Sequence, residues 1–260
     1  MNTDPATESH GRTTYRHGDL RRALIDAGLE LARSGGPAAV VLREATRRAG
    51  VSPNAAYRHF ADRQALLEAV CSECQSGVAR AIEDEQAAIP VADAAASVMA
   101  DMTDMTAVTA VSVSDGRAGG RTTPAPGETD ANPAPVAPLT AETARLRFRA
   151  VGSGYLRFAL AEPGLFRTAF TASSDLESAT SAARAGARGL TPFQLLSEAL
   201  DNLVTTGVLP AERRPGAEFL AWSAVHGLAS LLLDGPLRSL PPQATQALIG
   251  RVVTMVEQGL

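Results

Sequence analysis

The side chains best suited to specific chemistry lie in residues 52–63, which read SPNAAYRHFADR. Arg58 has the geometry to donate two hydrogen bonds to O6 and N7 of guanine, and Asn54 can pair in the same way with adenine. At helical spacing Asn54, Ala55 and Arg58 fall on one side. Ser52 and Pro53 open that helix, where free N–H groups form a weak anion site. The segment therefore predicts base-reading contacts with double-stranded DNA.

Other chemistry finds little support in the sequence. There is no Ser/His/Asp arrangement, no carboxylate pair with an evident role and no nucleotide-binding glycine pattern, so we expect neither catalysis nor a cofactor. The 2 cysteines, Cys71 and Cys74, form a C-x-x-C pattern, and their helical spacing would allow a disulfide. A redox switch is therefore the alternative to simple packing. We interpret both as packing residues and expect no metal site, because no further Cys or His lies nearby.

Helical elements on both sides can position the DNA-contacting segment. We predict one short helix from Leu42 to Ala49, ended by Gly50, and a second from Pro53 to Phe60, with Ser52 as its N-cap. Two short helices joined by a glycine-containing turn describe a helix-turn-helix. An earlier helix ends at the stop Gly35-Gly36-Pro37 and supplies the scaffold through a buried stripe of Leu20, Leu24, Ala27 and Leu31.

The run AGVSPNAAYRHFADRQALL at 49–67 resembles the DNA-binding signature of the TetR family of bacterial transcription regulators. The upstream run at 15–36 is similar to the first helix of the same family. The resemblance implies that Tyr57, His59 and Arg63 hold phosphates and so fix register, not sequence choice. Alternatively, Tyr57 and His59 cover the edge of the core. Two positions depart from the pattern: Arg63 replaces the usual Lys, and Ala56 stands where many members carry Leu.

Charge is distributed unevenly along the chain. Its 260 residues carry a net charge of −4, yet residues 10–70 hold ten Arg against six Asp or Glu, which gives +4 there and −8 elsewhere. A basic segment on an acidic body fits a DNA-contacting head on a body that avoids DNA, although uneven surface charge alone is the alternative. The start of the chain is polar and no apolar run is long enough for a membrane span, so we expect a cytoplasmic protein without a membrane partner.

We predict an all-α fold in three parts. Residues 1–15 form a disordered arm whose Arg12 and Arg16 either contact the DNA backbone or remain solvated. Residues 16–62 form a three-helix head, the helix-turn-helix DNA-binding domain. Residues 63–260 form a helical body for regulation and dimerisation. A disordered insertion at about 107–138 interrupts this body, since residues 124–138 alone hold five prolines.

The run GYLRFALAEPGLFRTAF at 154–170 resembles the ligand-binding body of the same TetR branch, in which a W-x-x-x-H-G phrase also recurs. The resemblance implies that a small-molecule effector enters between the helices that carry Phe148, Phe193 and Trp222. Aromatic side chains and one histidine of these segments are candidate pocket residues, with plain core packing as the alternative for each. They are Phe148, Tyr155, Phe166, Phe170, Phe193, Trp222 and His226.

The last two predicted helices, at 215–234 and 244–258, point to dimerisation. The first is apolar on two faces and therefore needs two partners. One face serves the chain's own core. The other predicts a homodimer through a four-helix arrangement, as the resemblance also implies, unless it too packs within the chain. The predicted interface residues are Leu220, Leu228, Leu232, Leu248, Val252 and Met255.

These features predict a dimeric transcription regulator that responds to a ligand. We expect it to be a repressor whose DNA site, the operator, is a palindromic inverted repeat. One alternative class is an architectural DNA-binding protein, which would have no ligand cavity. Another is a small helical enzyme in which the head is incidental.

Overall fold

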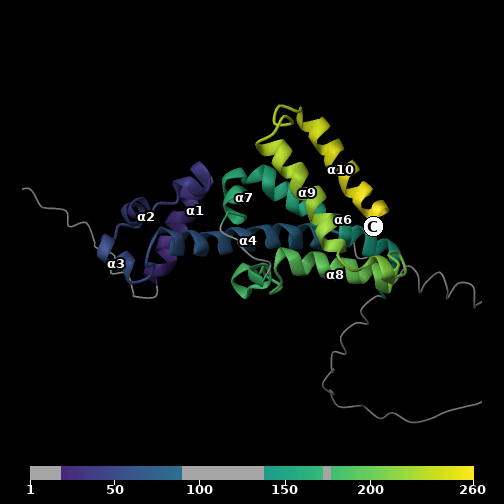
Figure 1. The fold of residues 1–260 in the computed structure, drawn as a ribbon, viewed down its shortest axis with the longest axis horizontal. Coiled ribbons are helices and arrows are strands. Elements are labelled where there is room, and N and C mark those ends of the chain that lie inside the picture. The colour runs from purple at the N-terminus through teal and green to yellow at the C-terminus, as the bar shows by residue number, and fades with distance from the viewer. Residues whose placement is uncertain (1–18, 90–137, 172–176) are drawn as a thin grey trace, which may run out of the picture.

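The computed structural model describes residues 19–89, 138–171 and 177–260. The arm predicted at 1–15 and nearly all of the insertion predicted at 107–138 lie outside these residues. Every regular element in the described residues is helical, which confirms the predicted all-α class. Figure 1 shows the head at one end, the body at the other, and a long helix running between them.

The head consists of α1 (Asp19–Ala39), α2 (Leu42–Ala49) and α3 (Pro53–Tyr57). The breaks predicted at Gly36 and Gly50 and the N-cap predicted at Ser52 are all present. The backbone of α1 leaves helical geometry at Gly36, with φ 66° and ψ −164°. Gly50 ends α2 at φ 66°, a left-handed conformation that glycine adopts at little cost. The Ser52 hydroxyl accepts a hydrogen bond from the N–H of Ala55, the third residue of α3, at 3.3 Å.

The second helix of the turn is shorter than predicted, because α3 ends at Tyr57 and not at Phe60. The N–H groups of Arg58 and His59 donate to carbonyls three residues back, which tightens the chain beyond an α-helical turn. This turn brings Phe60 into the core, where it is 2% exposed. Asp62 then caps the next helix through its side chain. The helix therefore ends early, although Ala56 and Phe60 are both buried as the predicted helical spacing requires.

Helix α4 (Arg63–Ala87) joins the head to the body (Figure 1). Its first half, including Leu66 and Val70, is buried in the core of the head, and that core extends to Cys74. Its second half, including Val78 and Ile82, is buried in the core of the body. The packing of the head thus continues past the boundary that we predicted at residue 62. A rigid helix shared by two cores can transmit tilt from one to the other.

In the described part of the body, five further helices and short 3₁₀ turns follow: α6 (Ala141–Ala161), α7 (Pro163–Ala169), α8 (Pro192–Thr205), α9 (Ala217–Leu233), α10 (Pro242–Gly259), η2 (Glu177–Thr180), η3 (Ala182–Arg184) and η4 (Ala211–Arg213). The side chains of Thr140 and Thr191 accept hydrogen bonds from the first turns of α6 and α8. Helices α9 and α10 form an antiparallel hairpin, and both pack on α6 (Figure 1).

Candidate DNA interface and effector cavity

The residues predicted to contact DNA share the surface of the head around α3. The core behind them is filled by Ala56 and Phe60, which are 0% and 2% exposed. The side chain of Tyr57 is 57% exposed, so it contributes little to that core. Two members of the predicted set, Ala55 and His59, are half-buried, and the others are exposed: Ser52, Pro53, Asn54, Tyr57, Arg58 and Arg63.

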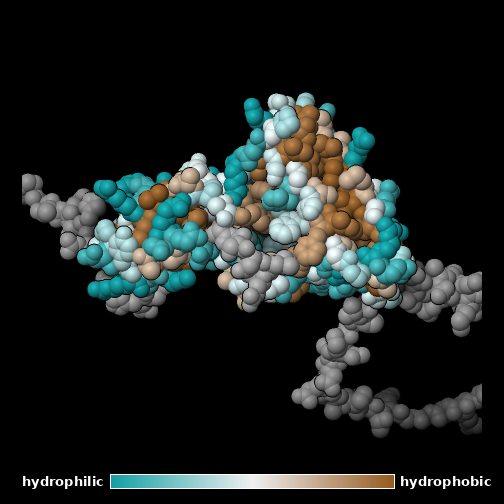
Figure 2. Space-filling view, viewed as in Figure 1, coloured by the Kyte–Doolittle hydropathy of each residue, from teal (hydrophilic) through white to brown (hydrophobic). Residues whose placement is uncertain are grey.

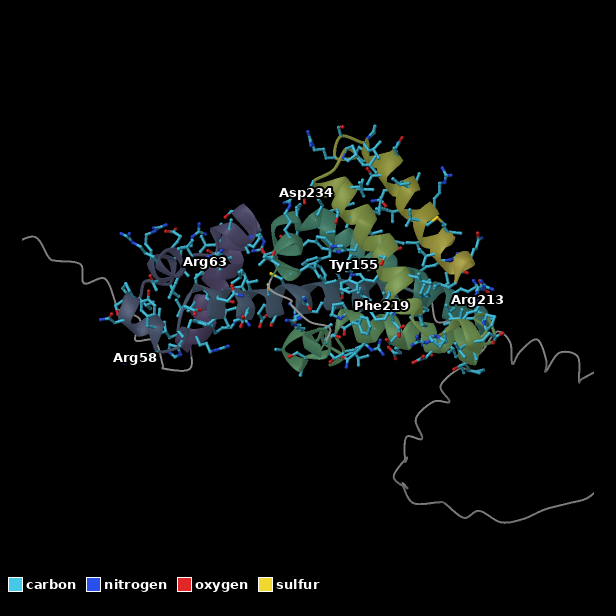
Figure 3. All side chains as sticks on the ribbon, in the orientation of Figure 1. Arg58, Arg63, Tyr155, Arg213, Phe219 and Asp234 are labelled. Carbon is cyan, nitrogen blue, oxygen red and sulfur yellow. The ribbon has the colours of Figure 1, made fainter. Side chains whose placement is uncertain are left out.

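Two arginines of this surface differ in their surroundings. Within the described part of the chain, Arg58 forms no ion pair, whereas Arg47 and Arg48 on α2 both pair with Glu44. Arg63 donates one N–H to the Pro37 carbonyl at 2.7 Å and so fastens the start of α4 to the end of α1. Figure 3 places both Arg58 and Arg63 at the end of the molecule away from α9 and α10. Arg58 is therefore the better placed for a bidentate contact with a base.

A cavity of about 350 Å³ lies in the body, bordered by α4, α6, α8, α9 and α10. Most of the predicted pocket residues line it: Phe148, Tyr155, Phe170, Phe193 and Trp222. The other two predicted pocket residues, Phe166 and His226, contact Tyr155 from outside the cavity lining. Phe166 packs edge-on against Tyr155, with ring centroids 5.3 Å apart. His226 reaches the Tyr155 hydroxyl through its Nδ1 atom at 2.8 Å. The arrangement suits a small apolar molecule.

Three of these side chains form a hydrogen-bonded chain around Tyr155, which Figure 3 labels in the middle of the body. The Trp222 indole N–H donates to the Tyr155 hydroxyl at 3.3 Å, and that hydroxyl is 2.8 Å from His226 Nδ1. Burial raises the pKa of Tyr155 well above its usual value, although the Trp222 hydrogen bond lowers it in part. Burial also lowers the pKa of His226. Both groups are therefore neutral near pH 7, and the tautomer of His226 decides which of the Tyr155 hydroxyl and Nδ1 donates in the hydrogen bond between them.

Sequence reasoning missed the two polar residues that line the cavity, Gln75 and Arg184. Gln75 is 5% exposed and donates its side-chain N–H to the Ala169 carbonyl at 2.6 Å. It lies four residues after Cys71, on the buried side of α4, so a polar residue on an apolar stripe was a usable signal. Arg184 is 8% exposed although it lies in a short 3₁₀ turn. Its surroundings in the sequence are aperiodic and gave no such signal.

Helix α7 connects this cavity to the head. Phe170, directly after α7, lines the cavity, while Leu165 and Ala169 belong to the core of the head. Arg167 pairs with Asp234 at the end of α9, with an N–O distance of 2.6 Å. One short helix therefore contacts the head, the cavity wall and the last hairpin of the body.

Both cysteines are buried, and no disulfide joins them. The Cys71 thiol donates to the Thr168 carbonyl at 2.6 Å. Burial, together with the neighbouring Cys71, raises the pKa of Cys74 far above its usual value, which disfavours the reactive thiolate. These surroundings fit the predicted packing role. Among the residues that the structure describes, no group of His, Cys, Asp and Glu is arranged to hold a metal, and no helix is both long and apolar enough to cross a membrane.

The predicted dimer residues divide into two groups. Leu220 and Met255 are 65% and 58% exposed, and Leu248 and Val252 are half-buried beside the core. Figure 2 shows apolar surface gathered over α9 and α10. In contrast, Leu228 and Leu232 are 5% and 6% exposed, since they fill the core of their own chain. Little of either side chain is left for a second copy to contact, and their assignment to the interface stays a prediction.

The helical architecture and the helix-turn-helix head define a DNA-binding regulator, and comparisons with known families agree. A family model described as bacterial regulatory proteins, tetR family, matches residues 24–70. A second, described as the tetracyclin repressor-like C-terminal domain, matches residues 148–256. The two matches together cover more than half of the chain. The chain belongs to the TetR family and is a DNA-binding transcriptional regulator, not an enzyme.

A solved structure also has a fold similar to that of this chain. The structure of a protein with unknown function from Rhodococcus sp. RHA1 is similar over 96% of this chain and 99% of that one, with a TM-score of 0.60. The two sequences are 21% identical, so the likeness concerns the fold alone. No curated protein matches the chain.

Proposed function

We propose that the protein is a homodimeric repressor that leaves an inverted-repeat operator when a small-molecule effector fills the cavity of the body. The observation that carries the proposal is the position of α7, which contributes to the core of the head and ends at Phe170 in the cavity wall. An effector that displaces Phe170 would displace α7, and α7 is packed on α1. The cavity also disfavours the architectural class, which would need none.

Exposed apolar surface on α9 and α10 supports the homodimer. Leu220, Leu231 and Met255 are 65%, 45% and 58% exposed, which is uncommon for large apolar side chains on one continuous face. Contact with a second copy through the same hairpin would cover them around a two-fold axis. The two heads of such a dimer would meet two half-sites about one helical turn of DNA apart, or a multiple of that spacing.

Release follows from linkage between the two sites. If the effector favours a conformation whose head spacing does not fit the operator, then operator DNA must weaken effector binding by the same factor. Tyr155 and Trp222 belong to the aromatic part of the cavity lining, which would hold the apolar part of the effector. A compound that binds the cavity but leaves operator affinity unchanged at saturation is not an inducer.

The base-reading role of Arg58 is tested by selecting bound sequences from random duplex DNA with the wild type and Arg58→Ala. We expect the wild type to enrich an inverted repeat. The variant should relax the preference at one symmetric pair of positions, because one bidentate contact is worth about 1–3 kcal/mol of discrimination. Fluorescence anisotropy on the selected site and on single-base variants measures that loss.

Arg213→Ala is the matched control, since this arginine lies at the opposite end of the molecule, where it donates to the Gly259 carbonyl at 2.8 Å (Figure 3). It should select the same repeat as the wild type. An identical preference in wild type and Arg58→Ala would remove Arg58 from the reading surface. Selection of a site without symmetry would contradict the dimeric mode of binding.

A further inference from the structure

The lining of the body cavity is mostly apolar, and its polar groups come from adjoining segments. Gln75 enters from α4 and Arg184 from η3. The residues next to them are hydrogen-bonded to each other, since the Ser76 hydroxyl donates to the Ala185 carbonyl at 2.7 Å. Gln75 and Arg184 therefore mark one polar end of the cavity.

The aromatic wall offers little polar chemistry to a ligand. The indole N–H of Trp222 already donates to the Tyr155 hydroxyl, and that hydroxyl is also hydrogen-bonded to His226. Phe148, Phe193 and the aliphatic residues have no hydrogen-bonding side chains. This part of the cavity presents ring faces and edges, which suit an apolar body.

Among the described residues that line the cavity, Arg184 is the charged one. No carboxylate is among the described residues that line the cavity, whereas Arg184 is a permanent cation that is 8% exposed. The buried acid that anchors the same loop, Glu83, accepts N–H groups of Ala187 and Arg188 at 2.8 and 2.9 Å. Arg184 also interacts within the chain, but its guanidinium has five N–H donors, more than one acceptor group can use. A second, anionic acceptor from the cavity side would fit it.

We propose that the effector is an amphiphilic carboxylate, with its anionic group on Arg184 and its apolar body against Tyr155 and Trp222. At about 30 Å³ for each water-sized group, the volume of about 350 Å³ holds about a dozen non-hydrogen atoms. Cationic ligands are excluded by charge. The proposal rests on the proposed function, because it names the chemistry of the same effector site.

Pairs of probe ligands that share one apolar body and differ only in charge separate the contribution of the carboxylate to binding from that of the apolar body. We would measure binding of 2-naphthoate against 2-naphthamide, and of decanoate against decanamide, by isothermal titration calorimetry and by quenching of Trp222, the sequence's single tryptophan. In the wild type we expect at least one carboxylate to bind about tenfold or more tightly than its amide, as a charge-assisted hydrogen bond requires. That preference should disappear in Arg184→Met and persist in Arg184→Lys.

Arg147→Met is the control, since Arg147 is exposed on α6 and does not line the cavity; it should keep the preference. Operator binding without ligand and the unfolding midpoint report whether Arg184→Met is folded. The proposal is overturned if the amides bind as tightly as the carboxylates, if the preference survives in Arg184→Met, or if no probe binds the wild type below about 1 mM. Binding that depends on Arg184 but leaves operator affinity unchanged would uphold the ligand class and reject the proposed release.

Discussion

Leu220→Glu is expected to make the protein monomeric at micromolar concentration and to weaken operator binding by about a hundredfold or more. The leucine is 65% exposed on α9, so the folded chain tolerates the change. In a two-fold dimer the substitution places two carboxylates in one apolar interface, where each would be buried without a partner. A monomer then holds only one half-site and loses the affinity that the second head provides.

The position of Leu220 makes this variant informative. Arg213, just before α9, donates to the Gly259 carbonyl at the end of α10, so the start of one helix lies beside the end of the other. Leu220 and Met255 therefore belong to the same end of the hairpin, and both are exposed. Multi-angle light scattering gives the oligomeric state, and fluorescence anisotropy gives the operator affinity.

The matched control is Leu146→Glu, the same change on α6 at a leucine that is 37% exposed. It should remain dimeric, with operator affinity near that of the wild type. A dimeric Leu220→Glu with unchanged operator affinity would show that α9 does not form the interface. Loss of the dimer in both variants would point to general destabilisation instead.

The elements that the sequence predicted well depend on local chemistry. Gly50 and Ser52 fix the turn between α2 and α3 through a left-handed backbone and a side-chain cap, and both act within a few residues. Thr140 and Thr191 cap α6 and α8 through the same kind of local contact. The end of α3 was misplaced because the chain tightens at Arg58 and His59 before it becomes extended at Asp62, the N-cap of α4. The helix propensity of residues 53–60 does not show where such a tightened turn begins.

Burial that depends on distant packing was harder to predict from the sequence than the caps and turns. Leu228 and Leu232 repeat at helical spacing as well as Leu220 and Leu231 do, and periodicity does not say which stripe faces the chain's own core. The aromatic pocket residues were found because large apolar side chains in neighbouring helices must meet somewhere. Arg184 was missed because its burial results from tertiary contacts of a short, aperiodic turn. Polar residues that line a cavity are for this reason the hardest part of the site to predict.

The contact between α7 and α1 was also invisible in the sequence, and it leads to the second large effect. A Cβ atom on Gly164 would lie 2.3 Å from the Ala32 carbonyl oxygen and 2.5 Å from that of Arg33. Both neighbours are backbone atoms of α1, so no side chain can rotate away. Gly164→Ala must therefore push α7 off α1 or distort one of the two helices.

We expect Gly164→Ala to destabilise the fold by about 2–3 kcal/mol, since overpacking of this kind typically costs about 1–3 kcal/mol. For a chain of this size the unfolding midpoint should fall by about 5–10 °C, which differential scanning calorimetry measures. Operator affinity should fall by more than about tenfold, because α1 is the scaffold of the head and small misplacements of the heads cost several contacts.

Gly259→Ala is the control, because a Cβ atom there meets nothing within 4 Å; its stability should change by less than about 0.5 kcal/mol. If Gly164→Ala matches the wild type in both midpoint and operator affinity, α7 is not held against α1 in solution. The proposed route of release would then fail as well, since it requires that a displacement at Phe170 be carried through α7 to the head. If the variant folds but binds the operator weakly without any effector, the same contact supports both the fold and the response.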